Sequence, residues 1–175
     1  MLFGRLSKDP EWLAPVLGMP ADEAARTAAS ALAAFREGML VFTRWVLVMT
    51  RFEQAFYRDP EQDLDALWWD LVERFQLVHR PDGRRAPDWA AKVHIATAPV
   101  YYHAYLMGEC TASQLAHHVR QTTGRGLVDN PEAGVFLRER FFAPGSTRSW
   151  DDHLAAATGR PLDPSSFLAD LGIPA

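Results

Sequence analysis

The chain has 175 residues, of which 48% are hydrophobic, and this size and composition are typical of one globular domain rather than a disordered segment. Its net charge of −4, with basic residues scattered among acidic ones, argues against a DNA or RNA partner. The most apolar stretch, residues 39–49, is short and contains Arg44, so we expect no segment to cross a membrane.

The single cysteine and the N-terminus indicate the compartment. Cys110 cannot form an intramolecular disulfide, which suits a reducing environment. It lies beside Glu109, which raises the pKa of a thiol, so we expect it to be buried and inert. The apolar run at Met1 stops after three residues and does not form a signal peptide. We therefore expect a cytoplasmic protein.

Helix N-termini are marked by a short side-chain acceptor followed by proline, because proline lacks only an N–H that the first turn leaves unpaired anyway. Four such pairs are present: Asp9-Pro10, Asp59-Pro60, Asn130-Pro131 and Asp163-Pro164. Ser149, with Asp152 three residues later, resembles a capping box. Strand-like alternation of apolar and polar residues is absent, so the pattern predicts an all-α fold of seven or eight helices.

The longest predicted helix lies between Pro20 and Pro60. Apolar residues recur there at steps of three and four, which mark one helical stripe: Phe35, Met39, Phe42, Trp45, Met49, Phe52 and Phe56. A second helix is expected from Asp59 to about Val78. Further apolar residues widen the stripe toward burial on all sides, so we expect this helix to belong to a larger assembly.

A polar loop at residues 79–87 separates these helices from the rest of the chain. Residues 92–97 are expected to be a loop or an extended segment, and Pro99 is expected to open a helix that runs to about Thr122. We expect a single all-helical domain over residues 1–175. Its parts are long helices at 1–80, a candidate site segment and helix at 88–122, and short helices at 130–175, near 131–142, 149–158 and 164–171.

No motif for a self-contained hydrolase is visible. The chain lacks H-E-x-x-H, the pair of histidines and the glutamate that helical zinc peptidases use. His103, His117 and His118 lie on one predicted helix, but no two of them are three or four residues apart, so none share a face at metal-ligand spacing. No serine lies in a G-x-S-x-G motif. The chain is therefore expected to bind no metal by itself.

Tyr102 and Tyr105 are three residues apart, which places both hydroxyls on one helix face. Lys92 and His94 precede that helix, and alternate residues of an extended segment project the same way, so both side chains can converge near the tyrosines. An ammonium, an imidazole and a phenol together suit a peptide ligand. From spacing alone, a tyrosine stripe packed in the core is the simpler interpretation and stays open.

From about Ala31 to its end, the chain resembles the C-terminal part of the angiotensin-converting-enzyme family of zinc peptidyl dipeptidases, and more distantly the thimet-type oligopeptidases. The resemblance rests on the order and spacing of several short motifs: Phe52-Glu53 to Asp59-Pro60, Leu67-Trp68-Trp69, Lys92-Val93-His94-Ile95, Tyr102 to Glu109, Gly145-Ser146, Ser149-Trp150 and Thr158-Gly159. It implies the fold of the C-terminal half of a helical zinc peptidase.

The resemblance also implies roles for four residues. Lys92 would bind the C-terminal carboxylate of a peptide substrate, with Tyr102 beside it. His94 would bind a backbone carbonyl, and Tyr105 would stabilise the oxyanion formed during hydrolysis. Compared with the animal enzymes, this chain has one extra residue between His94 and the tyrosines, so Tyr101 is an alternative to Tyr102.

Two departures from the family limit what the resemblance implies. The animal enzymes carry an arginine between the two tyrosines, whereas this chain has His103 and Ala104, so chloride dependence is not implied. The zinc ligands and catalytic glutamate of the family lie N-terminal to the matched region, and Met1 is expected to fall just after the third ligand. The chain is thus expected to be the substrate-binding portion of a metallopeptidase, inactive without a separate or missing zinc-binding half.

Two alternatives accompany this expectation. The chain could be a non-catalytic helical module, derived from the same fold, that binds peptides or takes part in assembly. It could also be an all-helical domain whose tyrosines only fill the core. An upstream reading frame containing H-E-x-x-H and a later glutamate would favour the split enzyme over both.

Overall fold

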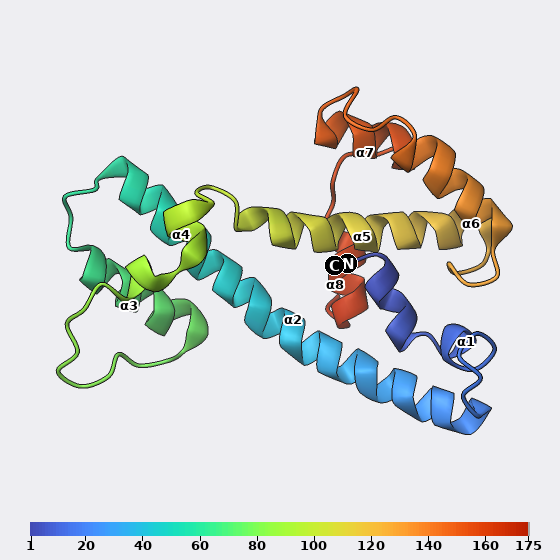
Figure 1. The fold of residues 1–175 in the computed structure, drawn as a ribbon, viewed down its shortest axis with the longest axis horizontal. Coiled ribbons are helices and arrows are strands. Elements are labelled where there is room, and N and C mark those ends of the chain that lie inside the picture. The colour runs from blue at the N-terminus through green and yellow to red at the C-terminus, as the bar shows by residue number, and fades with distance from the viewer. Residues whose placement is uncertain (175) are drawn as a thin grey trace. The chain divides into compact units, whose positions relative to one another are not determined.

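The computed structural model describes residues 1–174 and confirms the predicted all-α fold, since the described residues include no strand. Eight α-helices occur in this part of the chain (Figure 1): α1 Pro10–Leu13, α2 Ala21–Arg58, α3 Leu64–Gln76, α4 Val93–Thr97, α5 His103–Thr123, α6 Pro131–Phe136, α7 Trp150–Thr158 and α8 Ser165–Leu171. Two 3₁₀ segments, Phe3–Lys8 and Asp88–Ala91, and a π-helical segment, Leu137–Phe142, accompany them.

Most of the predicted helix starts are confirmed by side-chain caps. Asp9 accepts a hydrogen bond from the backbone N–H of Glu11 at 3.0 Å, and Asn130 accepts one from Ala133 at 3.1 Å. Ser149 likewise caps α7. Helix α8 begins one residue later than predicted, at Ser165, although the Asp163 carboxylate accepts from the Ser165 N–H at 2.6 Å as an N-cap side chain does.

The predicted helix start at Asp59-Pro60 is wrong. Helix α2 continues to Arg58, and α3 begins only at Leu64. The carboxylate of Asp59 accepts from the Glu61 N–H at 3.2 Å, which forms a local turn. Asp63 is the residue that caps α3, accepting from the Ala66 N–H at 2.9 Å. Two competing acidic caps four residues apart cannot be ranked from local sequence alone.

The described residues form two compact units. The first combines Met1–Arg36 with the described residues from Gly108 onward, and the second is Glu37–Met107. Helices α2 and α5 each contribute residues to both units. The expectation of one domain over 1–175 stays a prediction, because two units that share helices can still fold together.

The second unit has an aromatic core, in which α3 and α4 lie beside the C-terminal part of α2 (Figure 1). Its buried members are Val48, Met49, Phe52, Trp68, Val72 and Ile95. Phe52 meets the Trp68 ring edge-on, with centroids 5.3 Å apart, and this geometry is favourable for aromatic pairs. The predicted stripe of α2 therefore supplies one side of this core.

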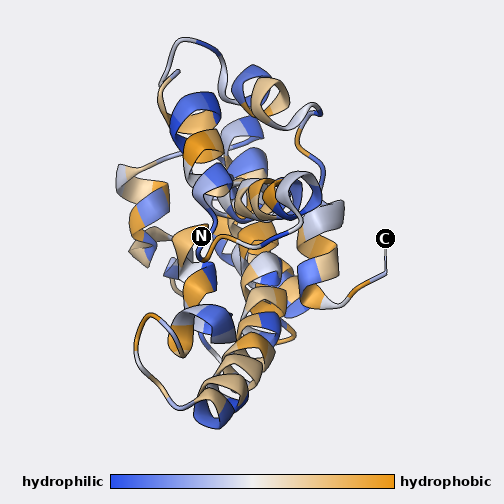
Figure 2. Ribbon diagram, turned by 90° about the vertical axis from the view of Figure 1, so that its right-hand side faces the viewer, coloured by the Kyte–Doolittle hydropathy of each residue, from blue (hydrophilic) through white to orange (hydrophobic). Residues whose placement is uncertain are grey.

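The first unit has smaller buried residues. Leu13, Ala24 and Ala28 form one cluster, and α5 buries Leu115 and Val119. Hydrophobic and hydrophilic residues are interleaved along the helices (Figure 2), as expected of amphipathic elements. Within residues 1–174, no helix combines the length and apolar character that a membrane span requires.

Candidate functional site

Residues 92–97 are not the loop or extended segment predicted from the sequence. Lys92 is the extended N-cap residue, with ψ of 108°, and His94 lies in the helical turn α4. The helix expected to open at Pro99 begins instead at His103. Between the two helices the chain makes a turn, in which Val100 adopts a left-handed conformation with φ of 54°.

This connection brings three of the four predicted residues together. The Nε2 atom of His94 lies 3.0 Å from the Tyr105 hydroxyl, within hydrogen-bond distance. The ring of Tyr102 meets the His94 ring edge-on, with centroids 4.8 Å apart. Tyr102 and Tyr105 are also in contact, at 5.3 Å between ring centroids. Tertiary packing of two helices, rather than alternation along a strand, therefore produces the convergence.

The two alternative tyrosines, Tyr101 and Tyr102, have different neighbours. Tyr102 lies against His94, whereas Tyr101 lies edge-on against Tyr105, with ring centroids 5.4 Å apart. Tyr101 is half exposed. Tyr102 is thus the better placed of the two alternatives to act together with His94.

The surroundings of the Tyr102 phenol favour its neutral form. Burial raises the pKa of Tyr102 above 10.0, a hydrogen bond with Trp45 opposes that rise, and nearby Tyr105 adds to it. A phenol is neutral at neutral pH in any case, so the Tyr102 side chain can donate a hydrogen bond there.

Lys92 does not join this cluster directly. Its Nζ atom lies 5.4 Å from the ring centroid of Trp45 and 5.6 Å from that of Trp68, which are cation–π distances. No carboxylate within residues 1–174 lies within the 4.0 Å of an ion pair with this ammonium. Trp45 is near both groups, because it carries the ammonium on its face and lowers the pKa of Tyr102.

A cavity of about 530 Å³ opens beside Lys92. Apolar side chains form most of its wall, and Arg84 and Asp88 are its other charged residues: Trp45, Trp68, Trp69, Val72, Gln76, Val78, Pro81, Arg84, Asp88, Ala91 and Lys92. Arg84 and Asp88 form an ion pair with each other. Lys92 is therefore the cation in this cavity that has no anionic partner.

The described residues offer no ready metal site. No group of three or more His, Cys, Asp or Glu side chains within residues 1–174 is arranged to hold an ion. The zinc that the resemblance implies does not fit the donors present here, so we assign no step to a metal in this chain. What the cluster can do by itself is bind: His94 and Tyr105 offer polar atoms, Tyr102 offers a neutral phenol, and Lys92 offers a positive charge.

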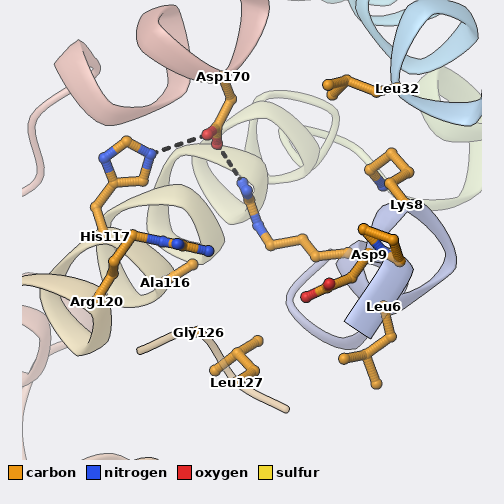
Figure 3. Close-up of a pocket in the computed structure, with 12 residues that line it drawn as sticks. Leu6, Lys8, Asp9, Leu32, Ala116, His117, Arg120, Gly126, Leu127 and Asp170 are labelled. Carbon is orange, nitrogen blue, oxygen red and sulfur yellow. Dashed lines mark hydrogen bonds and ion pairs between the residues drawn. The ribbon is translucent and has the colours of Figure 1, made fainter. Parts of the chain in front are cut away.

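A second cavity, of about 280 Å³, lies in the first unit and has a different character (Figure 3). The carboxylate of Asp170 on α8 forms an ion pair with Arg5 at 2.6 Å and lies within hydrogen-bond distance of His117 of α5, at 2.9 Å. Burial would raise the pKa of Asp170, but the hydrogen bonds from Arg5 and His117 outweigh it and lower that pKa. Asp170 and Arg5 thus neutralise each other, while Lys8, Asp9 and Arg120 add further charges to the lining of this cavity.

Sequence reasoning missed Asp170 and the role of the tryptophans. The sequence carries no signal that would pair Asp170 with Arg5, because 165 positions of chain separate them. The sequence pattern predicts Trp45 as an apolar stripe residue, which is correct for its packing, and Trp68 lies in the same core. That they also hold the Lys92 ammonium depends on the packing of α2 against α3. Cys110 is buried as expected, and burial, with the charge of Glu109, raises its thiol pKa.

Searches of protein-family models, curated protein sequences and solved structures find no match to this chain.

Proposed function

We propose that the chain is the substrate-binding, C-terminal portion of a zinc metallopeptidase of the peptidyl dipeptidase or oligopeptidase type. The observation that carries the proposal is the contact of His94 with Tyr105 at 3.0 Å, with Tyr102 packed edge-on against the same imidazole. The resemblance assigns His94 and Tyr102 to peptide binding and Tyr105 to oxyanion stabilisation. His94 comes from α4 and Tyr105 from α5, and Tyr102 directly precedes α5.

The free ammonium of Lys92 supports the same proposal. A cation on aromatic rings, beside an apolar cavity, attracts a carboxylate more strongly than a fully hydrated cation does. A peptide with a free C-terminus supplies such a carboxylate. The cavity beside Lys92 would then accept the last side chain of the peptide. The proposed ligand is therefore a peptide held by its C-terminal end.

The remaining role, stabilisation of the oxyanion, falls to Tyr105. Its hydroxyl is held by the His94 imidazole, so it is oriented before a ligand arrives. By resemblance, this phenol would stabilise the oxyanion formed when a peptide carbonyl is attacked. Attack itself requires the zinc-bearing part, which the described residues do not provide. We therefore expect the chain alone to bind peptides without cleaving them.

The binding step is tested with one peptide in two forms. An N-acetylated tripeptide with a free C-terminal carboxylate is titrated into the full chain by calorimetry, and its C-terminal amide serves as the comparison. We expect the free acid to bind about tenfold or more tightly, the size of effect that one charge-assisted hydrogen bond supplies. Equal affinity for the two peptides would contradict the proposal.

The chain offers a matched control for the variant, because Lys8 and Lys92 are its only two lysines. Lys92→Gln is expected to abolish the preference for the free acid, whereas Lys8→Gln is expected to leave it unchanged. A preference that persists in Lys92→Gln would show that another cation holds the carboxylate.

The absence of cleavage is tested separately. The pure chain is incubated with an internally quenched peptide and zinc, with and without a chelator. Turnover that the chelator abolishes would contradict the expectation that a separate part supplies the metal. Binding without turnover fits both the split enzyme and the non-catalytic module. Turnover after addition of a zinc-bearing partner part would then favour the split enzyme.

A further inference from the structure

We propose that Glu53 is a positioning residue for the peptide-binding cluster, an inference that rests on the function proposed above. Glu53 lies on α2 and is buried, with 5% of its surface exposed. Its Oε1 atom accepts a hydrogen bond from the backbone N–H of Val100 at 2.7 Å. A carboxylate from one helix thereby holds the connection between two others, α4 and α5.

Val100 is the residue in this connection whose backbone conformation has to be stabilised by its surroundings. Its φ of 54° lies in the left-handed region, which β-branched residues rarely adopt because their side chains crowd the backbone. Such a conformation persists only where the surrounding structure imposes it. The bond from the Val100 N–H to a buried carboxylate is charge-assisted and therefore among the stronger hydrogen bonds available for this purpose.

The conformation at Val100 determines how the two halves of the cluster face each other. His94 precedes it on α4, Tyr102 follows it directly before α5, and Tyr105 lies in the first turn of α5. If Val100 relaxed to a negative φ, the direction of α5 relative to α4 would change, and the His94–Tyr105 contact would be lost. Glu53 touches none of these three side chains through a hydrogen bond, so it acts through the backbone.

The burial of Glu53 argues that this bond is its main contribution. It has no cationic partner within 4.0 Å among residues 1–174. An apolar side chain of similar volume would avoid the cost of removing a charge from water, so packing alone does not account for a carboxylate here. Sequence reasoning singled out Phe52-Glu53 only as a matching motif. A glutamate next to the most buried aromatic of α2 was the signal for a further role.

The test uses Glu53→Met, which keeps the length of the side chain and removes the carboxylate. The first readout is the ¹⁵N spectrum of the histidine rings, in which the His94 signal reports the contact with Tyr105 and the His117 signal serves as an internal control. We expect the His94 signal to shift and the His117 signal to stay unchanged. The control variant Gln54→Met, at the adjacent exposed position, is expected to change neither.

The second variant separates positioning from packing. Glycine adopts a positive φ without strain, so Val100→Gly, added to Glu53→Met, is expected to restore the His94 signal. A loss caused only by disturbed packing around Glu53 would not be rescued in this way. The proposal is overturned if Glu53→Met leaves the His94 signal unchanged, or if Val100→Gly fails to restore it.

The third readout is affinity for the free-acid tripeptide, which we expect to fall about tenfold in Glu53→Met and to recover in the double variant. If the wild-type chain shows no preference for the free acid, the proposed function fails, whereas the ring spectrum still decides the role of Glu53. If Glu53→Met does not fold, Glu53→Gln takes its place, with an expected loss of about threefold from the weaker neutral acceptor. An unchanged His94 signal in that variant would equally overturn the proposal.

Discussion

Two histidines of this protein make side-chain contacts of nearly the same length in different surroundings. His117 of the first unit lies 2.9 Å from Asp170, and His94 of the second lies 3.0 Å from Tyr105. The first contact belongs to an ion network that also contains Arg5. The second joins two groups that carry no opposite charges. A short contact distance alone therefore does not mark a binding site. The two histidines differ in whether an opposite charge lies beside them.

The network around Asp170 is well suited to a structural role. Arg36 of α2 donates to the Asp170 carbonyl oxygen at 2.9 Å, while Arg5 and His117 reach its carboxylate. One residue of α8 thus ties the N-terminal segment, α2 and α5. The groups near Lys92 and His94 leave polar atoms and a positive charge free for a ligand. We therefore expect changes in the first unit to alter stability, and changes in the second to alter binding.

The largest expected effect is that of Asp170→Asn. It removes the negative charge from between Arg5 and His117, so that Arg5 remains largely buried without its partner. The free energy of unfolding, measured by urea denaturation, is expected to fall by about 3 kcal/mol, the lower end of the range for breaking a buried ion pair. Affinity for the free-acid tripeptide, measured where the variant is folded, is expected to stay unchanged.

The exposed pair of Asp22 and Arg26 provides the control for this variant. Asp22 and Arg26 lie 2.9 Å apart, but their side chains are 74% and 70% exposed. Asp22→Asn is therefore expected to have no measurable effect on the unfolding midpoint. Equal losses of stability in Asp170→Asn and Asp22→Asn would contradict the expectation that the ion network around Asp170 stabilises the first unit.

The second prediction concerns acid pH. The folded-state pKa of Asp170 lies below its ordinary value of 3.8, since hydrogen bonds from Arg5 and His117 outweigh its burial. The unfolded chain therefore binds the proton first, and the stabilisation is present above pH 3.8 and lost as the pH falls through the folded-state pKa. The difference in unfolding free energy between the wild type and Asp170→Asn should thus shrink below that pH. A difference that stays constant down to pH 2 would contradict this.

The smallest expected effect concerns Tyr102 at alkaline pH. Its folded-state pKa is raised above 10.0, chiefly by burial, so the unfolded chain loses the phenolic proton first. The contribution to stability is present below pH 10.0 and is lost as the pH rises through the folded-state pKa. In a spectrophotometric titration, Tyr102→Phe should remove absorbance from the last part of the curve.

Local sequence predicted the helices because their signals are local. The Asp9, Asn130 and Ser149 caps act within three residues, and the stripe of α2 depends only on the helical period. The errors occurred where two local signals competed or where no local signal exists. Asp59 and Asp63 are both suitable caps, and only Asp63 begins α3. Nothing in the residues around Val100 indicates a positive φ, which was therefore not predicted.

The sequence by itself determined the helical class, the long helix α2, the buried state of Cys110, and the set Lys92, His94, Tyr102 and Tyr105 as candidates. Periodicity, capping and residue chemistry act over a few positions, so they can be read without a structure. Only the tertiary structure decided that His94 meets Tyr105, that Lys92 rests on Trp45 and Trp68, and that Asp170 pairs with Arg5. These contacts join residues distant in the chain, and they depend on how helices pack and on a backbone conformation that no local pattern specifies.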